Sequence, residues 1–178
     1  MKKIGSVFSL ISVFLISLNV YAKSKYDPEC SVSGFDNVET CIVKPYGVYV
    51  FDKNTMLSTV SFGGLWVNSI PDHVSLTITL GDVMANVDKV SFNIDGEINT
   101  FPVDIRQNKI TRSGNLGTTI SAVIIPVDYL EKLLSGKDVK YRVSTISNGY
   151  REGSFYSEKG QASEPIKTLQ GLLDIVKK

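Results

Sequence analysis

Residues 74–80 read Val-Ser-Leu-Thr-Ile-Thr-Leu, and this stretch gives the clearest indication of the fold class. Apolar residues occupy every second position, and serine or threonine fills the positions between them. In an extended chain, successive side chains point to opposite faces, so the four apolar residues share one face. The dipeptide Gly81-Asp82 then ends the run. The pattern predicts a β-strand with one buried face.

Two hairpins are expected farther along the chain. In residues 89–101, a loop of three residues at 94–96 would place Phe92 opposite Ile98, and this hydrophobic match favours that register over a two-residue turn. Pro102 indicates that the second strand ends there or lies at a sheet edge.

The second hairpin centres on Asn148-Gly149, which separates strand-like residues 139–147 and 150–157. This dipeptide between two such runs is a strong hairpin signal. Further strands are expected at residues 47–51, which are apolar and aromatic, and at 118–125, which are rich in β-branched side chains.

Two helices complete the prediction. A short internal helix should begin with a capping box of Asp128 and Glu131 and end at Gly136. The C-terminal segment then changes to a helical period, with Ser163 and Pro165 suited to its first turn. Its apolar stripe consists of Ile166, Leu169, Leu172, Leu173 and Val176. The fold class is therefore mainly β, either an antiparallel β-sandwich or an α+β domain, with a short internal helix and a C-terminal amphipathic helix.

The N-terminus has the three parts of a cleavable signal peptide, predicted over residues 1–22. Lys2 and Lys3 precede an uncharged apolar run, and Val20-Tyr21-Ala22 approximates the small-residue cleavage pattern. The run is too short to span a bilayer comfortably, so no integral membrane span is expected after cleavage. Residues 23–178 then form a single β-rich domain that is periplasmic or secreted.

Cys30 and Cys41 are the two cysteines of the chain. In an oxidising compartment such a pair is expected to form a disulfide, which would pin the N-terminal segment 23–45. Their spacing fits neither a C-x-x-C redox motif nor a zinc site, and no histidine is near them. No metal and no cofactor are predicted.

The sequence assigns no catalytic residue. Its one histidine, His73, directly precedes the clearest strand and is interpreted as a turn residue, while serine-nucleophile and phosphate-loop motifs are missing from residues 23–178. A glycosidase mechanism needs two carboxylates. No pair stands out among the acidic candidates Asp95, Glu97, Asp104, Asp128, Glu131 and Glu152.

The candidate binding surface is the tip of the second predicted hairpin, residues 147–153, together with the aromatic residues that follow it. Its candidate binding residues are Tyr150, Arg151, Phe155 and Tyr156. Tyrosine and arginine are enriched at binding hot spots, and a hairpin tip projects from a rigid scaffold. The competing interpretation is that these aromatic residues only pack across strand pairs. Trp66, within an apolar run, is expected in the core, and Gly63-Gly64 in a turn or β-bulge.

Charge excludes one class of ligand. Removal of Lys2 and Lys3 with the signal leaves 17 basic against 18 acidic residues, a net charge of −1, whereas nucleic-acid binding requires a basic surface. The first function hypothesis is an exported binding protein, of the inhibitor, immunity or accessory-factor type, whose partner is another protein. The alternatives are a subunit of an extracellular or surface assembly, and a carboxylate-dependent enzyme acting on glycan or cell-wall material. The sequence does not define the oligomeric state.

Overall fold

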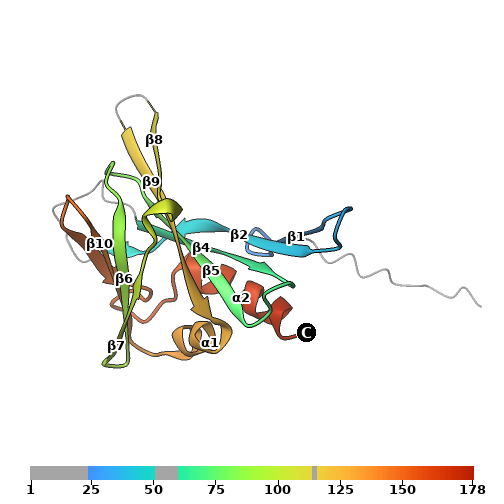
Figure 1. Ribbon diagram of the computed structural model, residues 1–178. Helices are drawn as coiled ribbons and strands as arrows, with labels where there is room; N and C mark the ends of the chain where they lie inside the picture. Colours follow the sequence, from blue (N-terminus) through green and yellow to red (C-terminus); the bar gives the residue numbers. More distant parts are fainter. Residues whose placement is uncertain (1–23, 51–59, 114–115) are drawn as a thin grey trace, which may run out of the picture.

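The computed structural model describes residues 24–50, 60–113 and 116–178, which form two antiparallel sheets and two α-helices (Figure 1). The predicted signal segment, residues 1–22, lies outside the described residues. The six-stranded sheet has the order β1 (Glu29–Val32), β2 (Glu39–Gly47), β4 (Val60–Val67), β5 (His73–Leu80), β9 (Leu116–Pro126) and β8 (Lys109–Ser113). The five-stranded sheet has the order β3 (Tyr49–Val50), β11 (Tyr150–Ser154), β10 (Val139–Thr145), β6 (Val87–Ile94) and β7 (Glu97–Pro102). The helices are α1 (Val127–Ser135) and α2 (Glu164–Val176), and a short 3-10 helix covers Ile105–Gln107.

The predicted fold class is confirmed: the chain is mainly antiparallel β, with a short internal helix and a C-terminal helix. The alternation in β5 also holds, because Val74, Leu76, Ile78 and Leu80 are all buried. No helix in the described part of the chain combines the length and apolar character needed to cross a bilayer.

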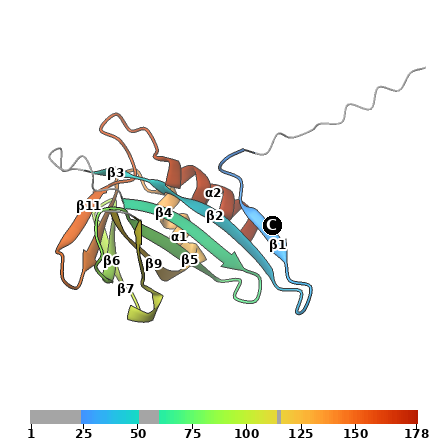
Figure 2. The same cartoon turned by 90° about the horizontal axis from the view of Figure 1, so that it is seen from above.

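The two sheets meet at an aromatic cluster. The ring of Phe62 on β4 lies 6.0 Å from that of Phe92 on β6 and 5.3 Å from that of Tyr141 on β10, measured between ring centres. Both helices lie on the same side of the six-stranded sheet as the second sheet (Figures 1 and 2). One core therefore fills the space between the two sheets and the helices.

Gly64 allows helix α2 to pack closely on β4. A Cβ at this position would lie 2.8 Å from a methyl carbon of Leu172 and 3.0 Å from one of Leu169. The expectation of a turn at Gly63-Gly64 is wrong, since both glycines lie inside β4. A strand irregularity does occur here, but its extra residue belongs to the neighbouring strand: the register shifts between Val43 and Tyr46 of β2, opposite Gly63.

The turn at Asp95-Gly96 also differs from the prediction. It contains two residues, Ile98 pairs with Asn93, and both turn residues have positive φ, 52° and 97°. That geometry matches the twist of the flanking strands, as in a type I′ turn. The hydrophobic match failed as a guide because β7 is an edge strand on which Ile98 is 67% exposed. The strand ends at Pro102, as predicted.

The helix ends follow the prediction in part. Helix α1 begins at Val127, directly after Pro126, so Asp128 lies in its first turn and the predicted capping box is wrong. Gly136 does end α1, and its N–H donates to the carbonyl of Lys132. Ser163 takes the N-cap position of α2 without a capping hydrogen bond from its side chain.

The hairpin of β10 and β11 is confirmed, with a longer loop than a two-residue turn. Its strands end at Thr145 and resume at Tyr150, and the N–H of Thr145 donates to the carbonyl of Gly149. The second strand stops at Ser154 rather than continuing to Ser157. Of the predicted strand at 47–51, β3 covers Tyr49–Val50, and Phe51 lies outside the described residues.

Candidate functional site

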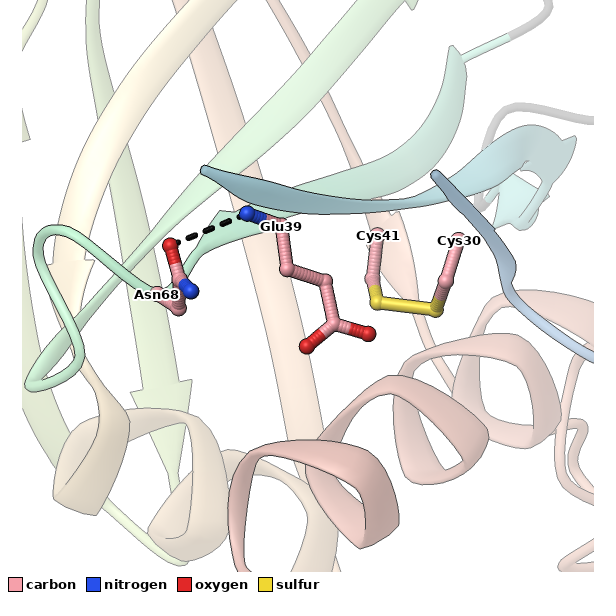
Figure 3. The surroundings of a disulfide bond; sticks show 4 residues. All are labelled: Cys30, Glu39, Cys41 and Asn68. Carbon is pink, nitrogen blue, oxygen red and sulfur yellow. Dashed lines mark hydrogen bonds between the residues drawn. A yellow bond between two sulfur atoms is a disulfide. The ribbon is translucent and has the colours of Figure 1, made fainter. Parts of the chain in front are cut away.

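The predicted disulfide between Cys30 and Cys41 is confirmed, and it joins residues directly opposite each other on β1 and β2 (Figure 3). The carboxylate of Glu39 lies close enough that the three side chains could together suggest a metal site. However, a sulfur in a disulfide offers no thiolate, which is the form that binds metals. The backbone N–H of Glu39 donates to Oδ1 of Asn68 at 3.0 Å, which ties β2 to the loop after β4. These contacts brace the hairpin and do not form a metal centre.

The structure does not bring the four predicted binding residues together on one surface. Phe155 is fully buried, with its ring 5.0 Å from that of Phe62, so its assignment to a binding surface is wrong. Tyr156 is half-buried against the core, and burial raises the pKa of its hydroxyl. The chain turns inward after β11, which removes both aromatic rings from the hairpin tip. Tyr150 alone remains substantially exposed, at 56%.

Arg151 has mainly structural contacts. Its guanidinium donates two hydrogen bonds to Oδ2 of Asp82, from Nε at 3.0 Å and from Nη2 at 2.8 Å. It donates two more to Asn148, from Nη1 to the backbone carbonyl and from Nη2 to the side-chain oxygen Oδ1. The Arg151 and Asp82 side chains are only 15% and 17% exposed. Arg151 thus fastens the β10–β11 hairpin to the end of β5 and has little surface left for a partner.

A groove of about 660 Å³ crosses the outer face of the five-stranded sheet. The strand register arranges its lining in rows. Lys89, Ser144 and Tyr150 form one row, and Ser91, Arg142 and Glu152 form the next. A third row, which includes Asn93 and Lys140, lies beside Ile98 on β7. Tyr150, the one predicted binding residue that stays exposed, therefore lies at one wall of a groove that four strands build.

Three cations and one carboxylate face this groove. Arg142 donates to Oε2 of Glu152 at 2.9 Å, and its guanidinium carbon lies 4.7 Å from the centre of the Tyr150 ring. Lys140 pairs with Asp138, which lies outside the lining. Within the described residues, Lys89 has no ion-pair partner. The groove is therefore net positive although the chain after residue 22 is near neutral, and the ring of Tyr150 is held by a cation–π contact with Arg142.

The chemistry of the groove suits binding. Its side-chain hydroxyls and amides can donate or accept hydrogen bonds, and Ile98 and Tyr150 supply apolar contacts at opposite walls. Glu152 is the one carboxylate among the described lining residues, and it is already paired with Arg142. The pair of carboxylates that glycoside hydrolysis requires is not assembled here. His73 is exposed at the start of β5, in the other sheet.

Sequence reasoning overlooked the lysines and arginine of the groove. Their signal is the alternation itself: positions 91 and 93 on β6, and positions 140, 142 and 144 on β10, are polar between buried neighbours. Lys89 lies two positions before Ser91 and so shares its face of the sheet. The pairing of β6 with β10 was the missing information, because only that pairing places the two polar sets side by side.

The chain matches no protein-family model, and comparison with curated proteins and with solved structures also yields no match. Function is therefore inferred from the geometry and charge of the groove.

Proposed function

We propose that this protein is an exported binding protein that holds an acidic segment of another protein in the groove on its five-stranded sheet. Export is supported by the predicted signal segment and by the Cys30–Cys41 disulfide, a bond that persists in oxidising compartments. The observation that carries the binding role is the positive groove itself, in which Lys89 lacks an ion-pair partner within the described residues.

The lining favours a peptide that carries both acidic and apolar side chains. Lys89 and Tyr150 lie in one row, separated by Ser144, so a carboxylate and an aromatic or aliphatic side chain could be bound side by side. Ile98 provides a second apolar contact across the sheet. Tyrosine at the wall of a hollow is a frequent anchor, since its ring offers a large contact area at low entropic cost.

Calorimetric titration with a defined probe tests this function. The probe is a capped peptide, Glu-Glu-Phe-Glu-Glu, and Gln-Gln-Phe-Gln-Gln is its neutral control. We expect the acidic peptide to bind more tightly, and its binding to weaken as salt rises, because exposed charges are screened. Equal affinities for the two peptides would contradict an acidic ligand.

Two substitutions locate the binding. Lys89→Gln should weaken binding of the acidic peptide by about 1 kcal/mol, or roughly fivefold in Kd, which is the scale of one exposed charge pair. Tyr150→Ala should weaken binding more, by about 2 kcal/mol, because it removes apolar contact area. Lys159→Gln, at an exposed position after β11, is the matched control and should leave affinity unchanged. Unchanged affinity in both groove variants would place the binding elsewhere.

A further inference from the structure

The loop that joins β1 to β2 presents one apolar ring to solvent. Residues 33–37 read Ser-Gly-Phe-Asp-Asn, and Phe35 at the centre of this loop is fully exposed. Apolar residues scattered singly over a surface are ordinary. Phe35 differs from them because it belongs to the loop between β1 and β2. That hairpin reaches away from the body of the molecule (Figures 1 and 2). We call residues 33–37 the Phe35 tip.

The Phe35 tip is held in a defined conformation. The N–H of Ser33 donates to the carbonyl of Val38 at 2.9 Å, and the N–H of Asn37 donates back to the carbonyl of Ser33 at 3.1 Å. The Asp36 carboxylate accepts from the N–H of Val38, and the Cys30–Cys41 disulfide closes the hairpin behind the tip. A side chain presented on a preorganised loop loses little further entropy on binding. The Phe35 tip therefore has the properties of a binding anchor.

The Phe35 tip and the groove have complementary chemistry. The tip offers one aromatic ring next to one carboxylate, Phe35 and Asp36. The groove offers an aromatic wall at Tyr150 and an ammonium without an ion-pair partner in the described residues, that of Lys89. Hydrogen bonds to the side chain of Ser33 and the backbone of Val38 lower the pKa of the Asp36 carboxyl and so favour its charged form further. An aromatic–acidic tip is thus the kind of ligand that the proposed function assigns to the groove.

The two features lie on opposite sides of the molecule. The β1–β2 hairpin extends from one side, and the five-stranded sheet lies on the other, in both views (Figures 1 and 2). A tip cannot reach the groove of its own chain in this arrangement. It can reach the groove of a second copy that stands in line with the first.

We infer that the Phe35 tip of one copy binds in the groove of the next, so that the chain assembles head to tail; this inference rests on the proposed function of the groove. Phe35 packs against Tyr150, and the Asp36 carboxylate pairs with Lys89. Such a contact joins two different surfaces, so a pair of copies keeps one free tip and one free groove to which further copies can add. Contacts of this kind build a ring where the rotation closes and an open filament where it does not.

Sedimentation velocity of residues 23–178 over a range of concentrations tests the inference. We expect species larger than a dimer to grow with concentration. Phe35→Ser and Lys89→Glu should each weaken self-association at least tenfold. Two control variants change exposed residues elsewhere: Ile70→Ser removes an apolar side chain, and Lys159→Glu reverses a charge. Both should leave self-association unchanged.

A mixing experiment separates this contact from other modes of association. The Phe35→Ser variant keeps its groove, and the Lys89→Glu variant keeps its tip. An equimolar mixture should therefore form a discrete 1:1 dimer, although each variant alone is monomeric. Absence of that dimer, with both variants folded by circular dichroism, would overturn the head-to-tail contact.

The two proposals fail in different ways. One outcome is a protein that binds the acidic phenylalanine peptide and yet stays monomeric at about 1 mM, a concentration at which a contact with a Kd of about 1 mM would be half formed. That result refutes self-assembly and leaves the groove to a different protein. A protein that neither binds the peptide nor self-associates refutes both proposals. Self-association that persists in both variants also overturns the inference, because the contact then uses another surface.

Discussion

Replacing Arg151 with methionine should destabilise the fold. Methionine keeps much of the aliphatic stem but removes four hydrogen bonds, two to the Asp82 carboxylate and two to Asn148. It also leaves the Asp82 charge mostly buried, with Oδ1 already lacking a hydrogen-bond partner. Breaking a fully buried ion pair in this way costs 3–5 kcal/mol as a rule. Because both side chains are about one-sixth exposed, we expect about 2–3 kcal/mol.

Urea unfolding of residues 23–178, followed by circular dichroism, measures this loss. A destabilisation of that size corresponds to a fall in Tm of roughly 4–10 °C for a domain of this length. A double-mutant cycle with Asp82→Asn isolates the pair, and its coupling energy should exceed about 1 kcal/mol. A loss of less than about 0.5 kcal/mol in Arg151→Met, which is typical of an ordinary surface change, would refute the structural role of this residue.

Three further predictions concern the core, the disulfide and pH. Gly64→Ala should destabilise the fold by about 1–3 kcal/mol, because its Cβ would overlap leucine side chains of α2. Gly34→Ala places its Cβ in open space and should be nearly neutral in the same urea assay. Equal effects of the two substitutions would contradict the close packing of the helix on β4. Removing the disulfide by Cys30→Ala with Cys41→Ala should lower the free energy of unfolding by about 3 kcal/mol, the entropic value for a loop of this size. An unchanged urea midpoint would show that the disulfide does not stabilise the fold. Burial, with the nearby Glu97 charge, raises the pKa of Tyr129 from 10 to about 12, so stability present below pH 10 should be lost as pH rises toward 12. Tyr129→Phe should reduce that loss between about pH 10 and 12. An identical pH dependence in variant and parent would refute the assignment.

Local pattern alone predicted much of the architecture. The alternation at residues 74–80 predicted a buried strand face, and Asn148-Gly149 predicted a hairpin, because both signals depend on neighbours within a few residues. The C-terminal helix was predicted for the same reason, from apolar residues at helical spacing. The disulfide was predicted from the number of cysteines and from the export that the N-terminal segment predicts.

The incorrect predictions concern local structure that tertiary contacts determine. The turn at Asp95-Gly96 was misjudged because hydrophobic matching was applied to an edge strand, where Ile98 has no core to face. Gly63-Gly64 was expected in a turn or a β-bulge, but both glycines lie in a strand, and Leu169 and Leu172 of α2 occupy the space beside Gly64. These leucines are more than 100 residues distant in sequence. No local pattern contains either fact.

The candidate site was only partly predictable. Tyr150 was identified from its residue type and position, but Phe155 was assigned to the same surface because the inward turn after β11 has no sequence signal. The groove depends on the pairing of β6 with β10, residues about 50 positions apart. Phe35 was missed because the segment around it is polar, and a single aromatic residue in a polar loop has no period.

Chemical-shift mapping tests the central claim, the acidic-ligand groove, most directly. ¹⁵N-labelled residues 23–178 would be titrated with the capped Glu-Glu-Phe-Glu-Glu peptide, and the amide shifts followed residue by residue. We predict saturable shifts concentrated around Lys89, Arg142 and Tyr150 on β6, β10 and β11, and little change at the helices. The neutral glutamine peptide should produce smaller shifts at the same residues. Shifts that do not saturate, or that centre on the outer face of the six-stranded sheet, would contradict the account.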